Sequence, residues 1–179
     1  MTSEYNDKYL HEFLILKWIE MDFIINRNQF FDSIFLEEDL EYKSHARYFN
    51  SLTKYNGLIL PVFDFNTFLK DTFGSGVNNT FNIGLICSIS LFSKINQSLY
   101  RNYILKEKID ITQKYLALKI NVKAGIKRIP LSEIRLIPTG LREKMNQEGV
   151  LGCRFTIKKN IQYFVDIETI ICKFLREKG

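Results

Sequence analysis

Two segments of the chain carry a similar pattern twice, and this internal repeat limits the possible folds more than any single residue does. Phe13-Leu-Ile-Leu-Lys17 resembles Tyr115-Leu-Ala-Leu-Lys119, and Val62–Leu69 resembles Phe164–Ile171. Both pairs are offset by 102 residues, so the two patterns keep the same spacing in each copy. Two copies are too few for a solenoid. The repeat therefore predicts two similar subdomains that share a core.

Short apolar segments separated by tight turns are typical of a β-rich fold. We expect hairpins over residues 13–25 and 115–129, and a later hairpin in each copy over residues 48–65 and 150–167. Asn56-Gly57 is a strong turn signal because both residues tolerate a positive φ. Several short strands per copy favour two small closed barrels, since closure removes exposed strand edges.

An aspartate ends the last predicted strand of each copy, and an apolar helical pattern follows it. These residues are Asp64 in the first copy and Asp166 in the second. A carboxylate at this position accepts hydrogen bonds from the N–H groups of the first helical turn. We therefore interpret both as helix caps and not as a catalytic pair of carboxylates.

The middle of the chain has no counterpart in this alignment of the two copies. Its sequence predicts a flexible break at Gly74–Asn79, a buried strand within residues 81–92 and a helix after Ser93. We therefore expect one domain over residues 1–179. Its first half covers residues 13–73, a linker or insertion covers 74–114, and the second half covers 115–175.

Composition argues for a globular protein and against several kinds of site. The chain has 179 residues, of which 46% are hydrophobic, enough for a substantial core. It lacks a signal-peptide pattern and a long apolar run, which favours a cytoplasmic protein. Cys87, Cys153 and Cys172 lie far apart, which predicts buried thiols and no metal site. His11 and His45 have no nucleophile at a mechanistic spacing, so we expect neither a catalytic residue nor a cofactor.

Four stretches carry short motifs in a recognisable order: Ser51–Phe65, Ile129–Ile137, Gly149–Cys153 and Phe164–Ile171. They resemble motifs of the CheW family, the adaptor of bacterial chemotaxis. Ser51–Phe65 is similar to the family pattern "GVxNLRGxxxPVxDL", and Ile129–Ile137 is similar to "YAIPIxxVxEI". Gly149–Cys153 is similar to the closing pattern "GVxxL", and Phe164–Ile171 is similar to "LLDLExLL". The resemblance implies a mostly β fold with two pseudo-symmetric, five-stranded SH3-like barrels and a few short helices.

The resemblance also implies a function without catalysis. It implies a cytoplasmic scaffold recruited to membrane-bound receptor arrays. Its partners would be the regulatory domain of a CheA-type histidine kinase and the cytoplasmic tip of methyl-accepting chemoreceptors.

Four residues align with partner contacts of that family: Asp32, Ser51, Asn56 and Gly57. Asn56 stands where the family usually has arginine, and Ser51 stands where it usually has glycine. The four residues also have a purely structural interpretation as a solvated acid, a strand residue and the two residues of a turn.

Two other functions fit parts of the sequence. A net charge of +5 with many Phe and Tyr residues would suit a nucleic-acid-binding protein built on small β-barrels. The cations are scattered and form no dense stripe, so a nucleic acid is not the expected partner. A small-molecule sensor that uses a cleft or residues 74–114 is the third alternative.

Overall fold

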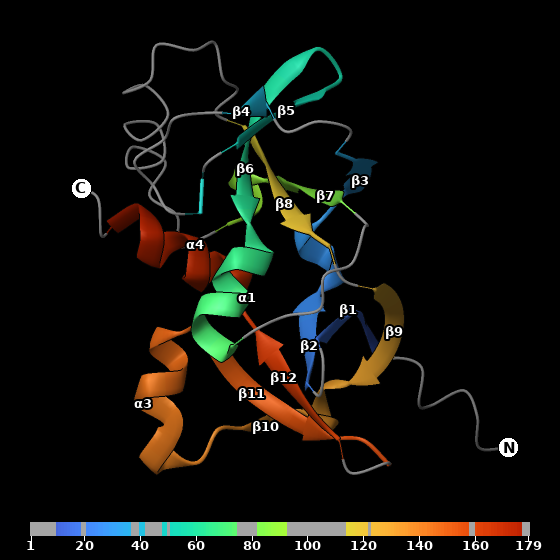
Figure 1. Ribbon diagram of the computed structural model, residues 1–179. Helices are drawn as coiled ribbons and strands as arrows, with labels where there is room; N and C mark the ends of the chain where they lie inside the picture. The colour runs from blue at the N-terminus through green and yellow to red at the C-terminus, as the bar shows by residue number, and fades with distance from the viewer. Residues whose placement is uncertain are drawn as a thin grey trace, which may run out of the picture. The chain divides into compact units, whose positions relative to one another are not determined.

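The computed structural model describes most residues of the chain. These residues are 10–18, 21–36, 40–41, 48–49, 51–74, 82–92, 114–121, 123–157 and 160–176. The chain forms two compact units (Figure 1). Unit 1 consists of Met1–Asn28 and Lys123–Ile167, and unit 2 consists of Gln29–Val122 and Glu168–Gly179.

Unit 1 is built on one curled sheet of six strands. Its elements are β1 (Leu10–Trp18), β2 (Met21–Asn26) followed by the 3-10 turn η2 (Arg27–Gln29, of which Gln29 belongs to unit 2), β9 (Ala124–Pro130), the 3-10 turn η4 (Leu131–Glu133), β10 (Arg135–Leu136), α3 (Thr139–Gln147), β11 (Val150–Phe155) and β12 (Ile161–Val165). The strand order is β10-β11-β12-β2-β1-β9. The pairing of β12 with β2 is parallel, and the other pairings are antiparallel. Phe13, Ile15, Ile24 and Ile129 form the core, because alternate residues of a strand point to the same face.

Unit 2 also has one six-stranded curled sheet. Its elements are β3 (Asp32–Phe35), β4 (Leu40–Glu41), β5 (Ser51–Tyr55), β6 (Leu58–Asp64), α1 (Phe65–Phe73), β7 (Ile83–Ser88), the 3-10 turn η3 (Ile89–Leu91), β8 (Tyr115–Ile120) and α4 (Ile167–Arg176), which belongs to this unit from Glu168 onward. The strand order is β4-β5-β6-β8-β7-β3, with β6 and β8 parallel. Leu36, Leu60, Val62, Ile86 and Ala117 form a core cluster.

An aromatic cluster joins the two helices of unit 2. The ring of Phe174 on α4 lies 4.4 Å from Tyr48, 5.9 Å from Phe63 and 5.8 Å from Phe68, measured between ring centroids. Figure 1 shows α4 in red passing beside α1 in green. Aromatic pairs at these separations add to the free energy gained from burial. The C-terminal helix is therefore an integral part of this core.

The two sheets have the same connectivity. Strands β1 to β6 with α1 follow the same course as strands β7 to β12 with α4. The sheet of unit 1 combines β1 and β2 with β9 to β12, whereas the sheet of unit 2 combines β7 and β8 with β3 to β6. The first copy, from β1 to α1, therefore contributes β1 and β2 to the sheet of the second copy. The second copy, from β7 to α4, contributes β7 and β8 to the sheet of the first. The compact units consequently differ from the halves expected at residues 13–73 and 115–175, because strand pairing groups segments that are distant in the chain.

One predicted hairpin and part of the repeat alignment are wrong. Residues 115–129 form no hairpin, because β8 pairs with β6 and β7 while β9 pairs with β1. In the strand order, β8 occupies the position of β2, so the likeness of residues 115–119 to residues 13–17 does not mark equivalent strands. The segment 81–92 does contain a strand, β7, but this strand is the counterpart of β1 and is not unmatched.

Several local expectations are confirmed. Asn56 and Gly57 form the turn between β5 and β6 with φ values of 47° and 78°. Asp64 caps α1, because its Oδ1 accepts a hydrogen bond from the Thr67 N–H at 3.0 Å. The expectation of a buried thiol is confirmed for Cys87 and Cys172, whereas Cys153 is only half-buried; none of the three forms a disulfide, and burial raises the pKa of Cys87. The helix expected after Ser93, like most of the predicted break after Gly74, lies outside the described residues.

The described helices are short, with nine residues in α1 and α3 and ten in α4. Among the described residues, no helix is both long enough and apolar enough to span a membrane.

Candidate protein-binding site

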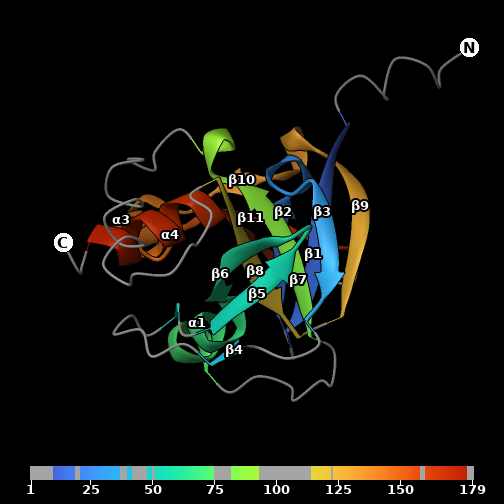
Figure 2. The same cartoon turned by 90° about the horizontal axis from the view of Figure 1, so that it is seen from above.

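Tyr55, the last residue of β5, connects two of the residues aligned with partner contacts. Its hydroxyl donates a hydrogen bond to Oδ2 of Asp32 at 2.7 Å, and Asn56 follows Tyr55 directly in the chain. The strands β3 and β5 are not neighbours, because β7, β8 and β6 lie between them in the sheet. The curl of the sheet therefore brings Asp32 to the end of β5, and Figure 2 shows this end reaching towards β3.

This hydrogen bond shifts the pKa of both partners. The Tyr55 hydroxyl and the Ser33 N–H both donate to the Asp32 carboxylate and hold the pKa of Asp32 below its ordinary value of 3.8. The same carboxylate raises the pKa of Tyr55 above its ordinary value of 10.0, and the Asn56 side chain opposes part of this effect. Because the bond lies at the surface, water weakens it, and its main effect is to orient the tyrosine ring.

Exposed apolar side chains surround this bond. The ring centroid of Phe31 lies 6.2 Å from that of Tyr55 and 5.4 Å from that of Tyr115. Phe31 is 44% exposed, and Leu58, which pairs with Tyr55 across the hairpin, is 38% exposed. We call this surface the Tyr55 face; it consists of Phe31, Asp32, Tyr55, Asn56, Gly57 and Leu58. Aromatic side chains held in place beside polar groups are enriched in protein-binding surfaces.

Ser51 lies apart from the Tyr55 face. It is the first residue of β5, whereas Tyr55 is the last. Its side chain is buried, and its Oγ has no hydrogen-bond partner among the described residues. Of the four residues aligned with partner contacts, the structure thus brings Asp32, Asn56 and Gly57 to one face and places Ser51 in the interior of the unit.

Sequence reasoning missed Phe31, Tyr55 and Leu58. A local signal did exist for Tyr55 and Leu58, because they flank Asn56-Gly57 and so must face each other across a two-residue turn. Phe31 had no such signal, since its contacts with Tyr55 and Tyr115 depend on the curl of the sheet.

Comparison with known proteins shows a likeness of fold and no likeness of sequence. No family model matches the sequence, and no curated protein matches it. The fold is similar to the crystal structure of the scaffolding protein TtCheW from Thermoanaerobacter tengcongensis, with a TM-score of 0.62. The alignment covers 93% of this chain and 91% of that chain at 10% sequence identity. This likeness confirms the expected fold class, which is mostly β with two small barrels and short helices.

Proposed function

We propose that this chain is a non-catalytic adaptor that couples chemoreceptors to a CheA-type histidine kinase in the cytoplasm. The observation that carries the proposal is the fold likeness to a CheW scaffolding protein over nearly the whole length of both chains. The ordered sequence motifs from Ser51 to Ile171 resemble those of the same family.

The Tyr55 face is the surface that we assign to the kinase regulatory domain. It combines exposed apolar area on Phe31 and Leu58 with the polar groups of Asp32 and Asn56. The hydrogen bond between Tyr55 and Asp32 restricts the ring before a partner arrives, which reduces the entropy lost on binding. An apolar centre with a polar rim is the usual anatomy of such an interface.

The test is a binding measurement with the full chain and two isolated partners, a CheA regulatory domain and a receptor cytoplasmic hairpin from the same organism. The informative variant is Phe31→Ala, and its matched control is Phe155→Ala, since Phe155 is also exposed but belongs to unit 1. Truncation of an anchor residue typically weakens binding by about tenfold or more. We expect that loss for the kinase domain with Phe31→Ala and no loss with Phe155→Ala.

One result would contradict the adaptor role, and a different result would contradict only the assignment of the Tyr55 face. If the folded chain binds neither partner, the adaptor role is wrong. If Phe31→Ala and Phe155→Ala bind the kinase domain equally well, the adaptor role stands but the Tyr55 face is not the surface that the kinase contacts.

A further inference from the structure

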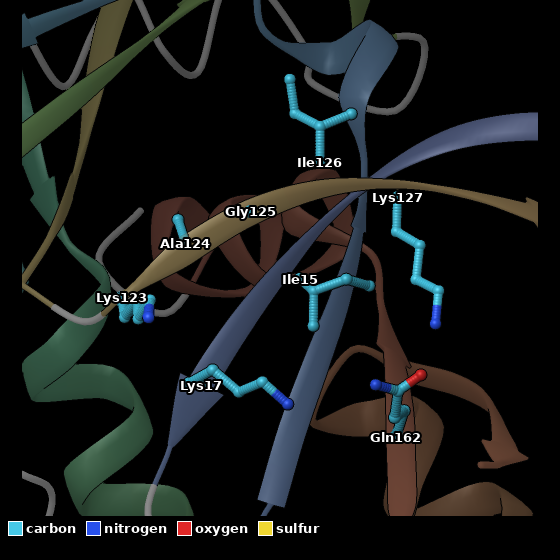
Figure 3. A pocket seen from close by; sticks show the side chains of 8 residues that line it. All are labelled: Ile15, Lys17, Lys123, Ala124, Gly125, Ile126, Lys127 and Gln162. Atoms are coloured by element: carbon cyan, nitrogen blue, oxygen red, sulfur yellow. The ribbon is translucent and has the colours of Figure 1, made fainter. Parts of the chain in front are cut away.

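A hollow of about 560 Å³ lies in unit 1, and neither the adaptor role nor the Tyr55 face accounts for it. Residues of β1, β9 and β12, together with Lys123, line it: Ile15, Lys17, Lys123, Ala124, Gly125, Ile126, Lys127 and Gln162 (Figure 3). Pockets that bind small molecules commonly have volumes between about 300 and 1,000 Å³. The size alone is therefore suitable for a small ligand, and the lining side chains define its chemistry.

Gln162 supplies a buried polar atom that lacks a partner. The residue is only 4% exposed, and its Nε2 donates a hydrogen bond to Oδ2 of Asp22 at 2.7 Å. This bond fixes which end of the amide is the oxygen. No described residue donates to Gln162 Oε1. A buried acceptor without a donor is unfavourable, so a ligand with an O–H or N–H group would satisfy it.

Lys127 supplies a positive charge to the lining of the hollow. Figure 3 shows its side chain extending from β9 towards Gln162, with Ile15 between Lys127 and Lys17. Lys17 is already neutralised, because its Nζ lies 2.6 Å from Asp22 Oδ2. Lys127 makes no ion pair with any residue in the described part of the chain. An anionic group on the ligand would therefore lie beside Lys127.

The space between these groups is apolar and open. Ile15 and Gly125 pair across β1 and β9, so a side chain added at Gly125 would lie on the same face as Ile15. A Cβ atom placed on Gly125 would meet no other heavy atom within 4 Å. This opening leaves room for the apolar body of a ligand above Ile15.

We propose that this hollow binds a small apolar monocarboxylate that carries a hydroxyl group next to the carboxylate. The carboxylate pairs with Lys127, the hydroxyl donates to Gln162 Oε1, and the apolar body packs over Ile15 and Gly125. We place the hydroxyl next to the carboxylate because Figure 3 shows the side chains of Lys127 and Gln162 extending towards the same part of the hollow.

The first test compares two probes by NMR titration of the ¹⁵N-labelled full chain. One probe is 2-hydroxy-4-methylpentanoate, and the other is 4-methylpentanoate, which lacks only the hydroxyl. We expect saturable shifts of the Gly125 amide and the Gln162 side-chain amide, with a Kd on the order of 1 mM for the hydroxy acid. The analogue should bind about tenfold more weakly because it leaves Gln162 Oε1 without a donor.

The second test uses variants that leave the core intact. Lys127→Gln should weaken binding of 2-hydroxy-4-methylpentanoate several-fold, whereas Lys144→Gln, an equal charge change on the exposed helix α3, should not. Gly125→Val should abolish binding without lowering the melting temperature. The proposal is overturned if neither probe causes saturable shifts, if both probes bind equally, or if the two lysine variants lose affinity equally.

Discussion

Tyr55 and Asp32 are 23 residues apart in the chain and lie on strands with three others between them, yet the tyrosine hydroxyl lies 2.7 Å from the carboxylate. The bond links the end of the β5–β6 hairpin to the start of β3. It therefore lies where the curled sheet of unit 2 closes on itself, and it holds Phe31 and Leu58 beside a rigid ring.

The Tyr55 to Asp32 bond predicts a specific pH dependence. A lowered pKa of Asp32 gives stability that is present above the ordinary value of 3.8 and is lost as the pH falls through the lowered pKa. A raised pKa of Tyr55 gives stability that is present below 10.0 and is lost as the pH rises through the raised pKa. The hydrogen bond therefore contributes its full stability between pH 3.8 and pH 10.0.

Tyr55→Phe should raise the pKa of Asp32, measured by NMR titration of its carboxyl carbon. The pKa should remain somewhat below 3.8, because the Ser33 N–H still donates to the carboxylate. Tyr163→Phe, which changes a tyrosine of unit 1, is the control and should leave the Asp32 titration unchanged. An unchanged titration in Tyr55→Phe would show that the bond does not persist in solution.

Phe63→Ala should be among the most destabilising substitutions in unit 2. The side chain is completely buried, and its ring lies 5.0 Å from Phe49 and 5.9 Å from Phe174. Loss of such a ring costs about 3–5 kcal/mol of unfolding free energy. Phe35→Ala, at a side chain that is 76% exposed, should change it by less than about 0.5 kcal/mol. Urea unfolding of both variants measures the difference, and equal values would contradict the described core.

Gly152→Ala should destabilise unit 1 because β10 passes very close to β11. A Cβ at Gly152 would lie 2.8 Å from the backbone oxygen of Arg135, which cannot move without disturbing the strand pairing. Overpacking of this kind costs about 1–3 kcal/mol. Gly140→Ala, in the exposed helix α3 with open space around it, should instead be neutral or stabilising by up to about 1 kcal/mol. Thermal unfolding distinguishes the two, and equal melting temperatures would argue against the close approach.

Cutting the chain between residues 78 and 79 should give two fragments that restore the fold only together. Each sheet needs strands from both sides of the cut, since unit 1 takes β1 and β2 from the first fragment and unit 2 takes β7 and β8 from the second. Co-expressed fragments should elute as a one-to-one complex with the NMR spectrum of the intact chain. Two separately folded monomers that do not associate would contradict the strand orders.

Features set by neighbouring residues were predictable from the sequence. The Asn56-Gly57 turn depends on φ preferences of two adjacent residues, and the Asp64 cap depends on a donor three residues later. The helix α3 was not predicted, because its described side chains are almost all exposed and so lack an apolar stripe.

Features set by pairing between distant strands were not predictable in the same way. Tyr115–Ile120 and Ala124–Pro130 are consecutive strands, and nothing in their own residues shows that they enter different sheets. The same limit applies to the candidate site, where Asp32 was identified by resemblance but its partner Tyr55 was not. A hydrogen bond across three strands leaves no pattern of fixed spacing in the sequence.

The reciprocal placement of the two first hairpins gives the chain the connectivity of a domain-swapped dimer whose two protomers have been joined end to end. In a swapped dimer of separate chains, the exchange would depend on protein concentration. Here β7 and β8 belong to the same chain as β3 to β6, so the length of the connecting segment sets their effective concentration. Dilution should therefore not undo the exchange.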